Sequence, residues 1–205
     1  MEDFFKLGAD VAIFSAHKFM GSLTAGIIAG RKKFIKNIYL QNLGIGRGMK
    51  VGKESIYAAI IGVEFWYKRD LKKELNKQNK IIEYWIKYLN KKNYKGISYE
   101  IIPDPTGNKI NRLRLYVNYK YSKFTAQSLA HFLEKNNPSI FVRDDLIHYN
   151  HFELDTCNLK NNQEKIVMKE MDKTIKKLLS KKIKNNIAQK EYDDFSKNNW
   201  LSWLG

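Results

Sequence analysis

Two short, uninterrupted apolar segments near the N-terminus constrain the fold more than any other feature of this sequence. Residues 11–14 and 27–29 carry only apolar side chains, which is typical of strands that are buried on both faces of a sheet. A polar, glycine-containing crossing with Ser15, His17 and Lys18 lies between them. We therefore expect an α/β sheet whose edge presents polar groups, where such folds bind their ligands.

The rest of the chain alternates helices with strands. Apolar residues recur at helical spacing from residue 53 onward, which predicts one long helix over 53–93, with a bend allowed. Beyond it, the pattern predicts strands at 97–102, 113–117, 139–143 and 147–154 and helices at 125–135 and 162–179. This order indicates a small α+β layer in which helices cover a sheet.

The C-terminal tail, 181–205, is polar and basic until its last residues. Trp200, Leu201, Trp203 and Leu204 are apolar, and we expect them to dock on this chain or on a partner.

Composition narrows the class of protein. One Cys in 205 residues excludes an internal disulfide framework and indicates a reducing compartment. No charge-free apolar segment reaches the roughly 20 residues that a membrane span needs, and the N-terminus lacks a signal-peptide pattern. A cytoplasmic protein without a membrane partner is the expectation.

The net charge of +16 raises the question of nucleic-acid binding. The lysines are dispersed along the whole chain among Asn, Ile and Tyr. This pattern favours a solvated, lysine-rich surface, so a nucleic-acid partner is not expected.

Lys18 is the first candidate for chemistry. It directly follows a predicted buried strand, and a partly desolvated lysine can act as an imine-forming nucleophile. Ser15 and His17 can donate hydrogen bonds to a phosphate, and Gly21 and Gly26 let backbone N–H groups approach an anion. The alternative is an ordinary surface lysine at the end of a strand.

Two blocks of sequence resemble a known family. Residues 8–21 and 24–32 resemble the lysine segment of fold-type I enzymes that depend on pyridoxal 5'-phosphate (PLP). They look most like the branch of L-seryl-tRNA(Sec) selenium transferase (selenocysteine synthase) and D-glucosaminate-6-phosphate ammonia-lyase. Residues 44–54, a glycine-rich loop with Arg47, Lys50 and Lys53, are similar to the ammonia-lyase-like members. The resemblance covers residues 1 to about 180, more loosely after the two blocks.

The resemblance implies roles for individual residues. Lys18 would hold PLP through a covalent imine and act as the catalytic lysine, and Ser15 and His17 would lie near the cofactor phosphate. Arg47 and Lys50 would bind an anionic group of the substrate or cofactor; for Arg47, a loop ion pair with a nearby carboxylate is an equal alternative. No metal ligand is expected.

The resemblance also implies an architecture. The fold class is α/β, the C-terminal part of a fold-type I PLP-dependent transferase large domain followed by a small α+β domain. We expect a large-domain remnant at 1–52, a connecting helix at 53–93, the small domain at 94–180, and a basic tail with an apolar end at 181–205.

The implied activity is PLP-dependent β-elimination or ammonia loss from an amino acid or an amino sugar acid phosphate. A homo-oligomer or a separately encoded N-terminal half is the expected partner. The alternative is a non-catalytic, basic module that binds RNA or protein.

The chain departs from the family before Lys18, because only 17 residues precede that lysine. In the family, the preceding segment supplies a phosphate-binding turn and the carboxylate that pairs with the ring nitrogen. Asp10 is a poor substitute for that carboxylate. A truncated gene product, one half of a split enzyme and a remnant kept for binding are the three interpretations.

Other candidates are weaker. Arg114 and Arg143 lie on predicted small-domain strands and could hold a substrate carboxylate, although the pattern favours a solvated arginine at both positions. His148 and His151 are three apart in a predicted strand, so they point to opposite faces and suit a shared metal poorly. Cys157 is a lone thiol without a neighbouring base, which favours a structural role.

Overall fold

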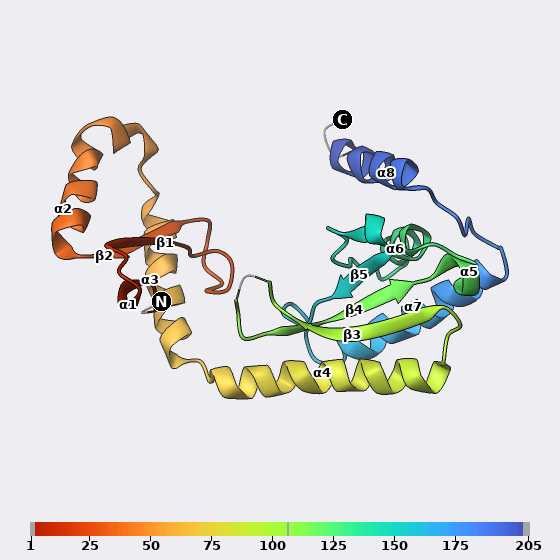
Figure 1. Cartoon of the computed structure of the whole chain (residues 1–205). Helices are drawn as coiled ribbons and strands as arrows, with labels where there is room; N and C mark the ends of the chain where they lie inside the picture. The colour runs from red at the N-terminus through yellow and green to blue at the C-terminus, as the bar shows by residue number, and fades with distance from the viewer. Residues whose placement is uncertain (1–2, 106, 203–205) are drawn as a thin grey trace. The chain divides into compact units, whose positions relative to one another are not determined.

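The computed structural model describes residues 3–105 and 107–202, apart from the side chains of Asp3 and Trp200. The chain divides into two compact units, unit 1 (residues 1–70) and unit 2 (residues 71–205), and each is described by itself (Figure 1). The boundary falls inside the segment 53–93 that the sequence predicts as a connecting helix.

Unit 1 is a β-hairpin surrounded by short helices. In chain order it contains α1 (Asp3–Lys6), β1 (Val11–Ser15), β2 (Gly26–Gly30), α2 (Lys32–Leu40), the 3-10 helices η1 (Gln41–Leu43) and η2 (Ile45–Met49), and α3 (Lys53–Lys68). Gly8 ends the first helix with a positive φ of 96°, a conformation that glycine adopts without strain. The N–H groups of Gly8 and Ala9 donate to the carbonyls of Phe5 and Phe4 at 3.1 Å, which is the Schellman pattern.

The predicted strands at 11–14 and 27–29 both form, but they are not buried on both faces. β1 and β2 pair antiparallel with Ile13 opposite Ile28, and these side chains are 74% and 42% exposed. The sheet of unit 1 has only these two strands within the described residues. Its other face carries Phe14, whose ring lies 6.0 Å from that of Phe4. The face of Ile13 is left without a covering layer.

The single helix predicted over 53–93 is wrong. α3 ends at Lys68, and α4 (Leu71–Lys92) begins three residues later. Arg69 is extended (φ −69°, ψ 143°), and its guanidinium lies 3.4 Å from the centre of the Trp66 ring, an attractive cation–π arrangement. Asp70 occupies the position before α4 that favours a capping side chain. The apolar periodicity runs through this break, which is why the sequence pattern does not reveal it.

Unit 2 is built on an antiparallel sheet with the strand order β3-β4-β5, formed by β3 (Ile97–Pro103), β4 (Asn111–Val117) and β5 (His151–Leu154). Its helices are α4, α5 (Tyr119–Ser122), α6 (Ala126–Glu134), α7 (Gln163–Leu179) and α8 (Gln189–Leu201). The helix predicted at 125–135 forms as α6, and Thr125 caps its start, because Thr125 Oγ1 accepts a hydrogen bond from the N–H of Ser128 at 3.1 Å. The prediction of a mixed helix-and-strand fold is therefore confirmed.

The core of the chain lies in unit 2. Leu113 and Leu115 of β4, Phe152 of β5 and Trp85 of α4 are almost fully buried. The Trp85 indole N–H donates to the carbonyl of Glu164 at 3.0 Å, so the only polar atom of this ring is satisfied and α4 is tied to the first turn of α7. One face of the sheet thus has the helical layer that an antiparallel sheet needs.

Two of the predicted strands are wrong in whole or in part. Residues 139–143 form no strand; only Arg143 makes an isolated bridge, to Glu153. Residues 147–149 are a 3-10 helix, η3 (Ile147–Tyr149), and only 151–154 join the sheet. Apolar content alone predicted strands here, but the segment that follows α6 through Asn137-Pro138 meets the sheet only at the bridge of Arg143.

The tail is not a loose extension of the chain. Residues 189–201 form α8, and Ile187 and Tyr192 are buried against the core. The predicted docking through the last apolar residues is not seen at Leu201, which is 60% exposed; Trp203, Leu204 and the Trp200 side chain lie outside the described residues. No helix in the described ranges is both long and apolar enough to cross a membrane.

Asp172 of α7 is the centre of a polar cluster that joins this helix to the end of α4. Its carboxylate accepts a hydrogen bond from the Tyr94 hydroxyl at 2.5 Å and pairs with Lys92 at 3.0 Å and with Lys176 at 2.8 Å. Burial alone would raise the pKa of Asp172. The hydrogen bonds from Lys176, Tyr94 and Lys92 together outweigh burial and lower the pKa to about 2.

We predict that Asp172→Asn destabilises unit 2 by about 1–3 kcal/mol at pH 7, because hydrogen bonds to the charged carboxylate are lost. The pKa in the folded state lies below the ordinary value of 3.8. The carboxylate therefore stabilises the fold above pH 4, and this contribution is lost as the pH falls from about 4 to about 2. Urea unfolding of both proteins at several pH values measures the difference, which must shrink below pH 4.

Asp194→Asn, on the exposed side of α8, is the matched control and should change the free energy of unfolding by less than about 0.5 kcal/mol. A difference between wild type and Asp172→Asn that stays constant from pH 7 to pH 2 would contradict the assignment.

Candidate functional site

Lys18 lies in a tight loop that joins β1 to β2. The loop is closed by two backbone hydrogen bonds of the fully buried Ala16: its N–H donates to the carbonyl of Ala25 at 2.9 Å, and its carbonyl accepts from the N–H of Ser22 at 3.1 Å. The N–H of Gly21 donates to the carbonyl of Lys18 at 3.1 Å, with Gly21 at φ +65°. Because a side chain at this φ is strained, glycine is required for the turn.

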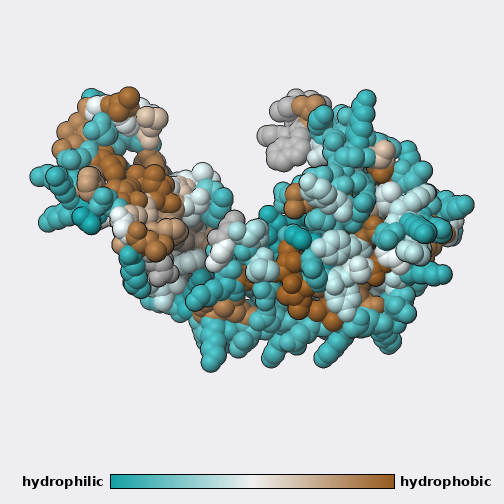
Figure 2. Space-filling model, in the orientation of Figure 1, coloured by the Kyte–Doolittle hydropathy of each residue, from teal (hydrophilic) through white to brown (hydrophobic). Residues whose placement is uncertain are grey.

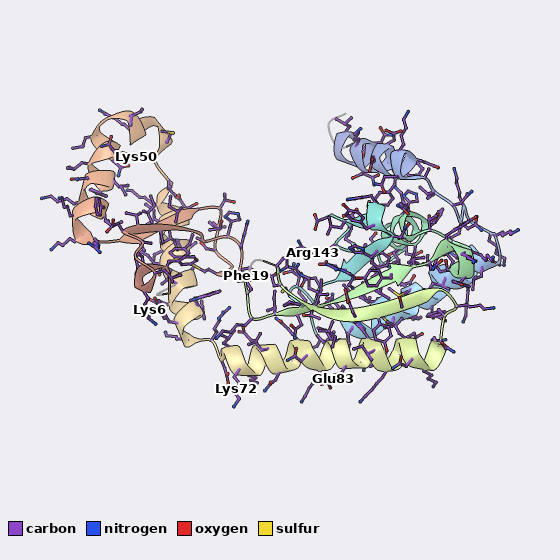
Figure 3. The ribbon with its side chains drawn as sticks, viewed as in Figure 1. Lys6, Phe19, Lys50, Lys72, Glu83 and Arg143 are labelled. Atoms are coloured by element: carbon purple, nitrogen blue, oxygen red, sulfur yellow. The ribbon has the colours of Figure 1, made fainter. Side chains whose placement is uncertain are left out.

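The side chains of Ser15, His17 and Lys18 are exposed. Within the described part of the chain, none of them makes a side-chain hydrogen bond or ion pair. The structure thus brings the three predicted residues to one end of the hairpin and leaves the lysine amino group accessible. Figure 3 labels Phe19, the next residue of the same loop.

Helix α3 supports this loop by close contact. A Cβ atom added to the buried Gly62 would lie 3.0 Å from the Met20 carbonyl oxygen and 3.3 Å from Ser22 Cβ. The hydroxyl of Ser22 is itself buried without a hydrogen-bond partner within the described residues. Glycine at position 62 therefore sets how closely the turn after Lys18 approaches the helix.

Arg47 and Lys50 do not come close to Lys18. Arg47 lies in η2 and Lys50 directly follows it, and both are exposed. In Figure 3, Lys50 lies at the opposite end of unit 1 from Phe19.

A PLP site would need a carboxylate for its ring nitrogen in addition to Lys18. Asp10 is the acidic residue nearest to Lys18 in sequence, but it precedes β1 while Lys18 follows β1. Its carboxylate also pairs with Arg31 at 3.0 Å. The accessible lysine and the hydroxyl and imidazole donors beside it fit the aldehyde and phosphate of PLP, whereas Asp10 does not fit the role of the carboxylate for the ring nitrogen.

A buried arginine in unit 2 was missed by the sequence reasoning. Arg112 of β4 is 5% exposed, and its guanidinium bonds to Asp104, to Asp155 at 3.1 Å and to Glu153 at 3.3 Å. Burial lowers the pKa of Arg112, but the carboxylates of Asp104, Asp155 and Glu153 outweigh it, so the pKa lies above its ordinary value. In the sequence, Arg112 alternates with apolar residues, a pattern that is typical of a solvent-facing side chain and does not indicate burial.

The two arginines that the sequence raised as carboxylate binders join the same network. Arg114 bonds to Glu153 at 2.8 Å and to Glu100 at 3.4 Å. Arg143 pairs with Asp145 at 3.2 Å and is 44% exposed. Since the carboxylates of this chain already bond to both guanidiniums, neither arginine is a free anion site, and Arg114 is not solvated as the alternative supposed.

The histidines and the cysteine occupy separate places. His148 lies in η3 and His151 in β5, so the assumption that both belong to one strand is wrong. Both ring nitrogens of His151 are buried without partners within the described residues, between Tyr116 and Tyr149 at ring distances of 5.2 and 6.3 Å. Burial, followed by the carboxylate of Asp155, raises the pKa of the Cys157 thiol to about 12.

Comparison with known proteins confirms the resemblance found in the sequence. Residues 1–95 match the family model of L-seryl-tRNA selenium transferase (SelA). A 5'-C-glycyluridine monooxygenase-decarboxylase from Streptomyces sp is 29% identical over 168 residues, which are 82% of this chain and 42% of that protein. D-glucosaminate-6-phosphate ammonia lyase from Salmonella typhimurium (strain 14028s / SGSC 2262) is 27% identical over 161 residues, 78% of this chain and 42% of that protein.

The fold agrees with the sequence comparison. A solved structure of D-glucosaminate-6-phosphate ammonia-lyase matches with a TM-score of 0.64 and 25% identity over 82% of this chain and 44% of that chain. The chain therefore spans less than half the length of the relatives that it matches.

We predict that Gly62→Val displaces the turn after Lys18, because the added carbons would overlap the Met20 carbonyl. The amide hydrogens of Gly21 and Ser22 should exchange at least about tenfold faster by NMR, since they donate within that turn. Glu64→Val, an exposed change on the same helix, controls for the helix propensity of valine. Equal exchange rates in both variants would contradict the close contact.

We predict that native Cys157 reacts with a maleimide at pH 7.5 at least about 100-fold more slowly than the same thiol in guanidinium chloride, because little thiolate exists at the raised pKa. Asp155→Asn should accelerate the native reaction by removing a carboxylate that disfavours the thiolate. Rapid native labelling with unchanged circular dichroism would show that the thiol is not held in this environment.

Proposed function

Since this chain is a relative of the L-seryl-tRNA selenium transferase family, we propose that it contributes the lysine half of a PLP-dependent lyase or transferase site. The observation that supports this is the exposed Lys18 at the end of an apolar strand, flanked by Ser15 and His17. In this proposal, unit 1 is part of a fold-type I large domain and unit 2 is the small domain.

The proposed reaction is β-elimination or loss of ammonia from an amino acid or an amino sugar acid phosphate. Two relatives act as an ammonia lyase and a monooxygenase-decarboxylase by their names, which supports the lyase class and leaves the substrate to experiment. PLP, when bound, supplies an electron sink for the charge left at the substrate α-carbon.

The residues of this chain would do three things. Lys18 Nζ binds the cofactor and, once the substrate replaces it, takes the proton from the α-carbon and returns it at a later step. Ser15 Oγ and the His17 imidazole donate hydrogen bonds to the cofactor phosphate. Arg47 and Lys50 bind an anionic substrate group in an assembled site, since they do not reach Lys18 in unit 1 alone.

The direct experiment is absorbance spectroscopy with added PLP. We predict a band near about 410–430 nm in the wild type, which borohydride reduces and fixes to the peptide that contains Lys18, as read by mass spectrometry. Lys18→Ala should lose both the band and the modified peptide. Lys33→Ala, an exposed lysine on α2, should keep both.

A second comparison separates phosphate contacts from imine formation. Ser15→Ala and His17→Ala should weaken PLP binding about tenfold each, because a hydrogen bond to a charged phosphate is lost, and should leave the binding of pyridoxal, which has no phosphate, unchanged. A wild-type adduct spread over many lysines, or an unchanged band in Lys18→Ala, would refute the proposed site.

A further inference from the structure

Helix α8 packs on α6 through a single face (Figure 1). This face is formed by four residues spaced three or four apart, namely Gln189, Tyr192, Phe195 and Asn199. The side of α8 seen in Figure 2 is largely hydrophilic, because the other residues of 190–198 are all polar or charged. A helix of 13 residues is marginally stable by itself in water. α8 therefore depends on its contact with α6.

His131 lies at the centre of this contact. Its ring stacks on that of Phe195 with 4.3 Å between the ring centres and 24° between the planes, and the Phe132 ring meets it edge-on at 5.0 Å. The His131 side chain is only 8% exposed. A proton on His131 would give an attractive cation–π contact with Phe195, but it would leave the N–H groups of the imidazolium poorly hydrated.

The charges near His131 do not compensate for its burial. Burial lowers the pKa of His131, Lys135 one turn along α6 lowers it further, and Glu191 on α8 opposes them with the smallest effect. Glu191 also pairs with Lys184 at 2.7 Å, and Glu134 accepts a hydrogen bond from α8 at 2.7 Å. The other elements that pack near α6 contribute uncharged groups: Thr174 of α7, Ile147 of η3, and Phe152 and Leu154 of β5.

The segment that precedes α8 is anchored separately. The N–H of Thr125 donates to the carbonyl of Asn185 at 2.9 Å, and the N–H of the buried Ile187 donates to Ser128 Oγ at 2.8 Å. The backbone is extended at Ala188 (φ −75°, ψ 157°), and α8 begins at the next residue. Rotation at Ala188 can therefore move α8 away from α6 without breaking these two bonds.

We propose that the protonation of His131 controls the docking of α8: the helix packs on α6 while His131 is neutral and detaches more often once His131 takes up a proton. Detachment opens the pocket that α8 lines together with Ala130, Ile140 and Val142, so α8 acts as a pH-sensitive cover. The inference goes beyond the proposed function, because α8 carries none of the residues proposed to bind PLP or substrate.

The pH range of the effect follows from the direction of the pKa shift. Docking lowers the pKa of His131 below its ordinary value of 6.5, so the docked state binds the proton less well than the detached state. Docking is therefore strongest above pH 6.5 and weakens below it, by at most about tenfold for each pH unit. Ordinary carboxylates stay ionised down to about pH 5.5, so the range from pH 7.5 to 5.5 isolates the histidines.

His148 of η3 also lies beside α8, but its protonation would act in the opposite direction. It lines a pocket with Asp144, Asp145 and the α8 residue Asp193. A proton on His148 would attract these carboxylates and strengthen the docking. Weaker docking at low pH thus distinguishes His131 from His148.

The test is amide hydrogen exchange of the full chain by NMR at pH 7.5 and 5.5, expressed as protection factors to remove the intrinsic effect of pH. We expect the protection factors of α8 to fall about tenfold at pH 5.5. Those of α7, Thr125 and Ile187 should stay within about twofold. In the same samples, the pKa of the His131 imidazole should lie below 6.5.

Two variants separate the histidines. His131→Phe keeps an aromatic ring against Phe195 but cannot take up a proton, so α8 should be equally protected at both pH values. His148→Gln, an exposed change, is the matched control and should keep the tenfold fall. The titration of the wild type decides the question even where a variant folds poorly. None of these measurements uses PLP, so a failure of the proposed function leaves them unaffected.

Three outcomes overturn the inference. They are α8 protection in the wild type that stays constant or rises at pH 5.5, an equal fall in His131→Phe, and a fall that extends over α7, which would mark unfolding of unit 2 as a whole.

Discussion

An apolar strand needs a neighbour along each edge and a layer over each apolar face, and the two units of this chain meet that requirement to very different degrees. In unit 2, β4 lies between two strands and one face of the sheet packs against helices, so Leu113 and Leu115 are fully buried. In unit 1, two strands of similar apolarity share a single ladder, and Ile13 faces solvent. The difference in burial arises because β4 has two neighbouring strands and a covering layer of helices, whereas β1 has one neighbouring strand within the described residues.

This asymmetry also affects the proposed chemistry. The turn that carries Lys18 is defined locally, by Ala16, Gly21 and the close approach of Gly62. A catalytic lysine additionally needs a surrounding wall that excludes water and holds the cofactor ring. The hairpin presents the lysine at its open end, and the groups that would form the wall are not on this hairpin. Local contacts within unit 1 thus fix the position of Lys18, whereas the groups that would surround its amino group must come from outside the hairpin.

The features that could be read from the sequence are those that short segments encode. The strands around Lys18, the Schellman turn at Gly8 and the capped start of α6 at Thr125 depend on neighbouring residues alone. The break at Arg69 has no glycine or proline to mark it. Arg112 was missed because its three carboxylate partners come from separate segments, and Arg47 could be named from its motif but not located relative to Lys18.

The carboxylates around Arg112 also restrict how this part of the chain can change over time. The guanidinium is buried against Asp104, Asp155 and Glu153, and removal of Arg112 would leave three carboxylates close together in a poorly hydrated place. Single substitutions there should be strongly disfavoured, whereas joint replacement by apolar residues of similar volume can be tolerated. In a large set of homologous sequences, these four positions should therefore covary as a group, from fully charged to fully apolar, with few mixed combinations.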